Sequence, residues 1–285
     1  MKWDEFDVEN SGDQFLLVSQ SNPGNIGIFV KNGKALVVDS GYSPRKMARL
    51  KELIENNLAC RIDLLFNTHY HSDHTFGNQV FNCPILASEE CYLAMKNALT
   101  SHWSPEEIRK AMAEDPTLKE KWQDLTITLP TETFSGQKSI EFEGTKIDFL
   151  RLGGHTPCSS IAVFPDYRFM FAGDLIFAER YPTLLWDGNP IELVSVLKRI
   201  DQMEIDTFAP GHGPICGKSS IDNLTDYYEC LIENCGKLLA DGKSIEEISD
   251  LWKELCPIPG VPMDEMRHKR NINSISGFLR GHDAR

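Results

Sequence analysis

The sequence has few basic residues, no long apolar run and no paired-cysteine motif. Its 29 Lys and Arg against 42 Asp and Glu give a net charge of -13, which disfavours nucleic acid and anionic membranes as partners. No stretch approaches the roughly 20 apolar residues that cross a bilayer, and the acidic opening segment MKWDEFDVEN lacks the pattern of a secretory signal. We therefore expect a cytoplasmic protein that acts on a small molecule, with homo-oligomers left open.

The eight cysteines are scattered, and none belongs to a C-x-x-C pair of the kind found in structural zinc and redox sites. Without an export signal, such cysteines are usually reduced. We expect reduced, mostly buried thiols. Cys158, three residues after a histidine, is interpreted as a packing residue.

The first part of the chain predicts strands followed by a helix. FLLVSQ and IGIFVKNGKALVVDSG are strand-like, and the Asn32-Gly33 pair between two apolar runs is a hairpin signal. Ser43 and Pro44 favour the start of a helix that ends around Asn57. The run IDLLFNTH is apolar on both faces at its centre, which is typical of a buried strand.

The rest of the chain alternates between helical and strand-like segments. Residues 88–125 predict a helical insertion, in which Ser104 and Glu107 fit a capping box. Strands resume in SIEFEGTKIDFLRL, SIAVFPD and RFMFAGDLIF, and a helix follows from Asn189 to Met203. We predict a catalytic domain over 1–217 and a helical extension over 218–285, whose last segment, 266–285, is basic and poorly patterned.

The segment NTHYHSDHTFGN, residues 67–78, is the densest group of metal-ligand side chains in the sequence. Three other candidates lie in LRLGGHTPCS, FMFAGDLIF and FAPGHGPI, each at the end of a strand-like run. Since ligands bind at the carboxyl ends of strands in layered α/β folds, we expect these groups to meet at one edge. The candidate ligands are His69, His71, Asp73, His74, His155, Asp174 and His212.

The size of this set indicates two metal ions. Zinc with imidazole and carboxylate ligands is usually four- or five-coordinate, so these seven side chains exceed the needs of one ion. His69 and His71 point to the same side of an extended segment and can share an ion, while Asp73 and His74 serve its neighbour. We predict two zinc ions, with iron or manganese as alternatives. The remaining histidines, His102, His268 and His282, are interpreted as structural.

The motifs THYHSDH, GGHTPCS, AGDLIF and PGHGP, with VVDSG upstream, resemble those of the metallo-β-lactamase superfamily. The resemblance implies an α/β fold, an αββα four-layer sandwich of two mixed sheets with outer helices. It implies that a first metal is bound by His69, His71 and His155, that a second is bound by Asp73, His74 and His212, and that Asp174 bridges them. It also implies that Asp39 orients one of the ligands.

Hydrolysis is the expected chemistry, because a water shared by two metal ions supplies hydroxide at neutral pH. We predict attack of this hydroxide on an ester, thioester or lactone carbonyl, as in the branches that resemble glyoxalase II and lactone hydrolases. Our candidate catalytic residues are Asp73, Asp174 and Tyr181, the last either as an aid to the oxyanion or as a packing residue. One alternative is a persulfide-dioxygenase-like enzyme with a single iron, and another is a β-lactam-hydrolysing enzyme or phosphodiesterase.

Substrate recognition is open at this level. Met95, Leu99, Trp103 and Trp122 of the insertion fit either an apolar lid or ordinary core. The basic residues Arg267, Lys269 and Arg270 fit either an anion site or a solvated face, and the solvated face is the preferred interpretation.

Overall fold

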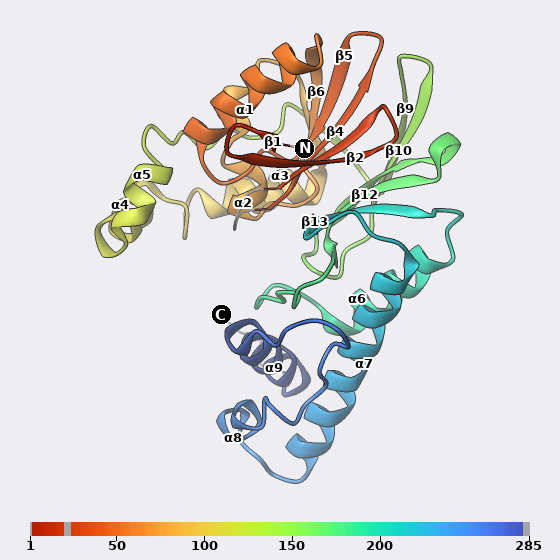
Figure 1. Cartoon of the computed structure of the whole chain (residues 1–285). Helices are drawn as coiled ribbons and strands as arrows, with labels where there is room; N and C mark the ends of the chain where they lie inside the picture. Colours follow the sequence, from red (N-terminus) through yellow and green to blue (C-terminus); the bar gives the residue numbers. More distant parts are fainter. Residues whose placement is uncertain (1, 20–23, 282–285) are drawn as a thin grey trace.

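The computed structural model describes residues 2–19 and 24–281, in which two β-sheets are stacked between helices (Figure 1). Within these residues the first sheet has eight strands, which pair in chain order. They are β1 (Lys2–Trp3), β2 (Phe6–Ser11), β3 (Phe15–Ser19), β4 (Ile26–Lys31), β5 (Lys34–Val38), β6 (Arg61–Phe66), β7 (Ile85–Ser88) and β8 (Glu132–Phe134). The second sheet has the order β13-β12-β11-β10-β9. Its strands are β9 (Gln137–Phe142), β10 (Thr145–Arg151), β11 (Ser160–Phe164), β12 (Phe169–Phe177) and β13 (Thr207–His212).

The helices fall into an N-terminal, a middle and a C-terminal group. They are α1 (Pro44–Asn57), α2 (Ser72–Thr75), α3 (Glu89–Ala98), α4 (Pro105–Glu114), α5 (Pro116–Lys121), α6 (Pro190–Asp201), α7 (Lys218–Ala240), α8 (Ile245–Asp250) and α9 (Glu265–Leu279), with the 3-10 turns η1 (Asn78–Val80) and η2 (Pro165–Tyr167). None of the helices in the described part of the chain is long and apolar enough to cross a membrane.

Alternating side chains hold the layers together. In β4 and β5, Ile28 and Val37 point to the cluster that packs on α1, whereas Phe29 and Leu36 join the aromatic cluster between the sheets. Both faces of these strands are therefore buried, which requires a layer on each side. The second sheet is covered by α6 and α7 (Figure 1). Both sheets combine parallel and antiparallel pairs, and the predicted αββα sandwich is confirmed.

Several local predictions are confirmed. Asn32 and Gly33 both have positive φ angles, 51° and 73°, as a type I′ hairpin between β4 and β5 requires. Helix α1 spans Pro44–Asn57, as predicted. Ser104 caps α4 through the backbone N–H of Glu107, although the reciprocal contact of a full capping box is not among its bonds.

The expected C-terminal helices are confirmed, and α9 forms from most of the basic, poorly patterned last segment. The buried face of α9 consists of His268, Asn271, Ile272 and Ile275, at helical spacing. Two of these side chains are polar, so the apolar pattern is broken although the helix is amphipathic. The division at residue 217 stays a prediction, because the apolar side chains of α7 and α9 belong to the same buried cluster as those of α6 and β12.

The expectation of reduced thiols is wrong for one pair of cysteines. Cys230 on α7 and Cys256, which lies before α9, form a disulfide with a Cα–Cα distance of 5.8 Å. The two residues are 26 positions apart, and only the packing of the C-terminal helices brings them together. The other six cysteines are free, and Cys91, Cys158 and Cys235 are buried among them.

Candidate metal centre

The ends of strands β5, β6 and β13 deliver most of the predicted ligands to one edge of the sandwich. Strands β5 and β6 are parallel neighbours, so the segments that follow them emerge side by side. Asp39 follows β5 directly, and His69 lies three residues after β6. His212 is the last residue of β13. The predicted meeting of distant segments at strand ends is therefore confirmed for these residues.

Asp174 departs from the expected placement, because it lies inside β12 rather than after it. The pairing of β12 with β13 is irregular at Gly173, whose φ of +52° favours glycine. Gly211 of β13 allows a close approach: a Cβ atom there would lie 2.0 Å from Oδ1 of Asp174. These two glycines let the carboxylate of Asp174 turn out of the strand toward the histidines.

The first group of side chains consists of His69, His71, His155 and Asp174, whose ligand atoms all lie within 4.8 Å of one another. His155 Nε2 lies 3.2 Å from His71 Nδ1 and 3.6 Å from Asp174 Oδ2. His69 Nε2 lies 4.0 Å from the same carboxylate oxygen. Three imidazoles thus face one carboxylate oxygen, at spacings that would suit a shared cation.

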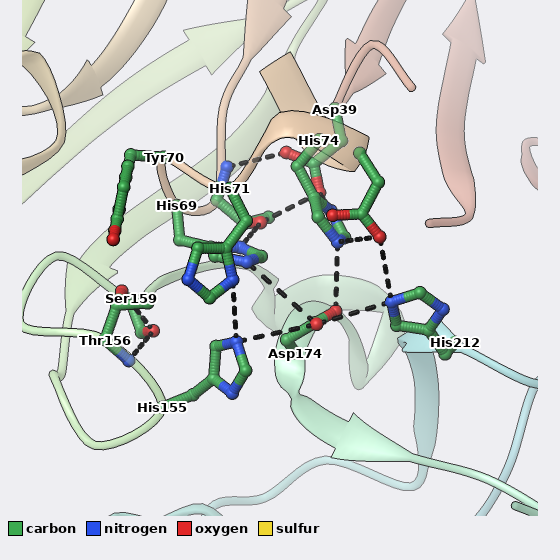
Figure 2. Close-up of polar contacts among 12 residues, drawn as sticks. Asp39, His69, Tyr70, His71, His74, His155, Thr156, Ser159, Asp174 and His212 are labelled. Atoms are coloured by element: carbon green, nitrogen blue, oxygen red, sulfur yellow. Dashed lines mark hydrogen bonds and ion pairs between the residues drawn. The ribbon is translucent and has the colours of Figure 1, made fainter. Parts of the chain in front are cut away.

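The second group consists of Asp73, His74 and His212, which also lie within 4.8 Å. His212 Nε2 lies 3.4 Å from Asp73 Oδ2 and 3.3 Å from Asp174 Oδ2. His74 Nε2 lies 3.1 Å from Asp174 Oδ1. Figure 2 shows Asp174 between the two groups, with dashed lines that reach imidazoles on both sides.

Hydrogen bonds behind the ligands fix which imidazole nitrogen faces the centre. His74 Nδ1 lies 2.7 Å from Asp39 Oδ2, so its N–H donates there and Nε2 is left to face the carboxylates (Figure 2). The Thr68 hydroxyl donates to Asp39 at 2.8 Å and accepts from His69 Nδ1 at 3.0 Å. Asp39 therefore orients two histidines, one of them through Thr68, which agrees with the role that the resemblance implies.

Asp187 is a site residue that sequence reasoning missed. Its Oδ2 lies 3.3 Å from His71 Nε2 and accepts a hydrogen bond of 2.7 Å from the Tyr70 hydroxyl. His71 consequently presents Nδ1 to the first group. The Asp187-Gly188 pair carries only a turn signal in the sequence, so nothing local marks it as a partner of His71.

The buried carboxylates of the site favour positive charge among its side chains, and burial keeps two of the histidines neutral. Burial lowers the pKa of His155 to about 4, and burial together with neighbouring imidazoles holds the pKa of His69 well below its ordinary value. Burial alone would raise the pKa of Asp174, but His212 and His74 hold it well below its ordinary range. His74 faces three carboxylates, which raise its pKa well above normal although burial opposes them. Positive charge is thus favoured between neutral imidazoles and ionised carboxylates.

The chemical nature of these side chains fits a metal centre. His69 Nε2 is buried and has no hydrogen-bond partner among the described residues. Buried polar atoms of this kind are costly unless something satisfies them. Imidazole nitrogens with carboxylate oxygens form the donor set of zinc and of related divalent metals.

Tyr181, a candidate catalytic residue, is not brought to this centre. It is 1% exposed, packs against Tyr227 and His268, and its hydroxyl accepts a hydrogen bond of 3.1 Å from the Ile258 N–H. The prediction that it assists an oxyanion is therefore wrong: its hydroxyl is engaged with backbone in the C-terminal core. Cys158 is 1% exposed and contacts Thr156, in agreement with a packing role.

The three histidines predicted to be structural lie in different surroundings. His268 is structural, as predicted: Nε2 donates to Leu255 O at 2.8 Å, and Nδ1 accepts from the Tyr227 hydroxyl at 2.8 Å. His102 lies in the wall of the site cavity instead. His282 lies outside the described residues.

A cavity of about 670 Å³ opens over the metal-ligand side chains. Its outer wall comes from three places: the insertion, the loop after β12 and helix α9. The wall residues beyond the ligand segments are His102, Trp103, Thr183, Leu185, Trp186, Met266, Arg267 and Arg270. Of the proposed lid residues, Trp103 contributes to this wall, whereas Met95 and Trp122 pack in the cluster beneath it.

Known proteins with the same architecture support this description. A family model for the metallo-beta-lactamase superfamily matches residues 21–212. A protein of Methanocaldococcus jannaschii described as a probable metallo-hydrolase is 28% identical over 193 residues, which cover 64% of this chain and 84% of that protein.

Solved structures show the same fold. A metallo-beta-lactamase from Pontibacter korlensis aligns with a TM-score of 0.63 at 17% identity, covering 79% of this chain and 99% of that one. The inverting sec-alkylsulfatase Pisa1 from a Pseudomonas species aligns with a TM-score of 0.72 at 12% identity. The alignment covers 96% of this chain, which spans 50% of the sulfatase. The chain belongs to the metallo-beta-lactamase superfamily of metallo-hydrolases.

Proposed function

We propose that this protein hydrolyses a small ester, thioester or lactone by attack at its carbonyl carbon. The reaction uses two divalent metal ions, and zinc is the best fit. The observation that carries the proposal is the position of Asp174. Its carboxylate lies between the two groups: Oδ2 is 3.6 Å from Nε2 of His155 in the first group, and His212 and His74 of the second group lie 3.3 Å from Oδ2 and 3.1 Å from Oδ1. A single carboxylate between two sets of ligands is the arrangement that a pair of ions needs.

In this proposal, His69, His71 and His155 would hold one ion, Asp73, His74 and His212 would hold the other, and Asp174 would supply a carboxylate ligand to each set. Such a pair of ions, when bound, lowers the pKa of water and polarises a carbonyl oxygen. The donor set is therefore suited to hydrolysis at neutral pH.

The supporting residues keep the ligands in one tautomer and one orientation. Asp39 and Thr68 hold the Nδ1 atoms of His74 and His69, and Asp187 holds Nε2 of His71. None of these three side chains needs to contact the substrate. Their role is to position the metal ligands. Loss of such a partner usually lowers the metal affinity or the activity of a site by about 10- to 100-fold.

The second set of ligands favours a dinuclear hydrolase over the enzyme with a single iron. Asp73, His74 and His212 lie close enough together to hold a second ion. Single-iron relatives keep much of the same motif, so metal occupancy decides between the two enzymes. The curated relative described as a metallo-hydrolase also supports hydrolysis. We retain the cytoplasmic location and the small-molecule substrate as predictions.

The test combines elemental analysis of protein purified without added metal with hydrolysis of thioesters, lactones and aryl esters. About two zinc or similar ions per chain, with turnover of one substrate class, would support the proposal. About one iron per chain without hydrolysis would refute it in favour of the dioxygenase. Turnover of a β-lactam or of a phosphodiester alone would assign a different substrate to the same site.

A further inference from the structure

The loop that joins β12 to α6, residues 178–189, carries Asp187. Two groups contact the Oδ2 atom of this carboxylate, the Tyr70 hydroxyl at 2.7 Å and His71 Nε2 at 3.3 Å, and both belong to the segment 67–78. The Oδ1 atom is buried and has no hydrogen-bond partner among the described residues. Because no other segment in this part of the chain bonds to the carboxylate, the backbone of the loop must set its position.

The C-terminal end of the loop is fixed to the site itself. The Asn189 N–H donates to Gly154 O at 2.9 Å, and the Asn189 side chain caps α6. Gly188 packs closely beside a predicted ligand, since a Cβ atom there would lie 2.9 Å from His155 O. The chain that follows Asp187 is thus anchored next to His155.

The N-terminal part of the loop is held by side chains of α9. Asn271 Oδ1 accepts from the Leu184 N–H at 2.8 Å, and Asn271 Nδ2 donates to Pro182 O at 2.9 Å. The Ser274 hydroxyl donates to Leu184 O at 2.9 Å. Both backbone groups of Leu184 are therefore satisfied by one helix, in a loop that has no strand or helix partner of its own.

Asn271 is itself held in one orientation. It is 0% exposed, and its Nδ2 also donates to the Tyr227 hydroxyl at 2.9 Å. The Tyr227 hydroxyl in turn lies 2.8 Å from His268 Nδ1. The carbonyl oxygen and both N–H groups of the Asn271 amide are thus engaged, which leaves it a single useful rotamer and fixes the loop atoms that it contacts.

Three side chains of α9 contact the loop from one face. Arg267, Asn271 and Ser274 follow one another at spacings of four and three residues, which places them in line on a helix. Arg267 is 15% exposed, and its Nη1 donates to Tyr181 O at 3.2 Å. The solvated-face interpretation is therefore wrong for Arg267.

We propose that Asn271 and Ser274 are positioning residues of the metal centre: from α9 they hold the 178–189 loop so that Asp187 orients His71. The path runs from these side chains to the backbone of Leu184, three residues before Asp187, and from the Asp187 carboxylate to the imidazole. The inference rests on the metal centre of the proposed function and not on its substrate. It makes the C-terminal helices part of the apparatus that shapes the first metal site.

Hydrogen exchange in the metal-free protein tests whether these contacts fix the loop. The amides of Gly188 and Asn189 lie beyond the residues that α9 contacts, so they report on the loop as a whole. We expect N271A to speed exchange at both amides by about tenfold, because lost buried hydrogen bonds favour local opening. S274A removes one bond and should speed exchange by about threefold. S276A makes the same change at a buried hydroxyl of α9 that forms no bond to the loop, and serves as the matched control.

Chelator competition for zinc tests the effect on the metal ligands. D187N identifies the ion held by His71, whose affinity it should lower by about 10- to 100-fold. We expect N271A to weaken the same ion by about tenfold. The double variant N271A/D187N should bind it no more weakly than D187N alone, because both changes act through one contact. S276A should keep the wild-type affinity.

A purely structural role for α9 gives different results. N271A and S274A would then lower the stability of the protein while both keep the wild-type zinc affinity, and this outcome would overturn the inference. So would losses of affinity that simply add in N271A/D187N, or wild-type exchange at Gly188 in both variants. If N271A does not fold, S274A carries both tests. Wild-type protein that binds no zinc would count against the proposed function, while the exchange rates would still decide whether α9 holds the loop.

Discussion

The substitution Gly211→Ala tests whether the position of Asp174 controls the site. A Cβ atom at residue 211 would lie 2.0 Å from Asp174 Oδ1 and 2.6 Å from the carbonyl carbon of Gly173. Ordinary contacts between heavy atoms need about 3.5 Å, so the carboxylate would have to retreat by more than about 1 Å. Alanine brings no change of charge, so the effect is steric.

The expected cost has two parts. Overpacking at a buried position costs about 1–3 kcal/mol of stability, and a 1 Å misplacement of a positioned group costs about 100-fold in rate. We therefore expect G211A to fold with a lower Tm, to bind less of the second metal, and to lose about two orders of magnitude in kcat.

Thermal melting, elemental analysis and initial rates measure these effects, with Gly217→Ala as the matched control. A Cβ atom at Gly217, which lies after β13, would meet only Asp206 O at 3.9 Å. Gly217 is the N-cap of α7, where alanine is less favourable than glycine, so the expected loss is at most about 1 kcal/mol of stability, with no effect on Asp174. Wild-type rates and metal content in G211A would refute the reasoning that close packing positions Asp174.

Three further predictions follow from single contacts. Asp39→Asn should weaken metal binding by His74 by about 10- to 100-fold, measured by chelator competition, because Asp39 Oδ2 holds His74 Nδ1 at 2.7 Å; unchanged affinity would show that this partner is dispensable. Asp187→Asn should act similarly on His71, with a fall in kcat and retained fold by circular dichroism; a loss of fold instead would indicate a structural role. Burial lowers the pKa of His268, so this side chain binds a proton more readily in the unfolded chain than in the folded one. The stability that neutral His268 contributes is complete above the pKa of an unfolded histidine, near 6.5, and is lost as the pH falls below that value. Urea unfolding between pH 7 and pH 5 should therefore show a shallower loss of stability in His268→Gln than in the wild type, and equal slopes would contradict this assignment.

Most of the metal-ligand set could be predicted because its signals are local. His69 to His74 occupy one short segment, and the type I′ turn at Asn32-Gly33 and the start of α1 at Pro44 depend on neighbouring residues only. The placement of Asp174 could not be predicted, because it depends on how β12 packs against Gly211 of the neighbouring strand.

Contacts between distant segments account for the other differences. Asp187 supports His71 across 116 positions of the chain, and its own neighbourhood indicates only a turn. The disulfide between Cys230 and Cys256 depends in the same way on the packing of the C-terminal helices. The apolar pattern of helix α9 is weak because its buried face includes two polar residues, His268 and Asn271. Both form hydrogen bonds with the Tyr227 hydroxyl in the core.

The central claim is that Asp174 serves two ions at once, and metal stoichiometry tests it most directly. The measurement is elemental analysis of wild type and Asp174→Asn after dialysis against a small excess of zinc, with circular dichroism to show that both fold. We predict about two ions per chain in the wild type and about one or fewer in the variant, with activity lost in parallel. One ion per chain in the wild type, or two in a fully active D174N protein, would contradict the account.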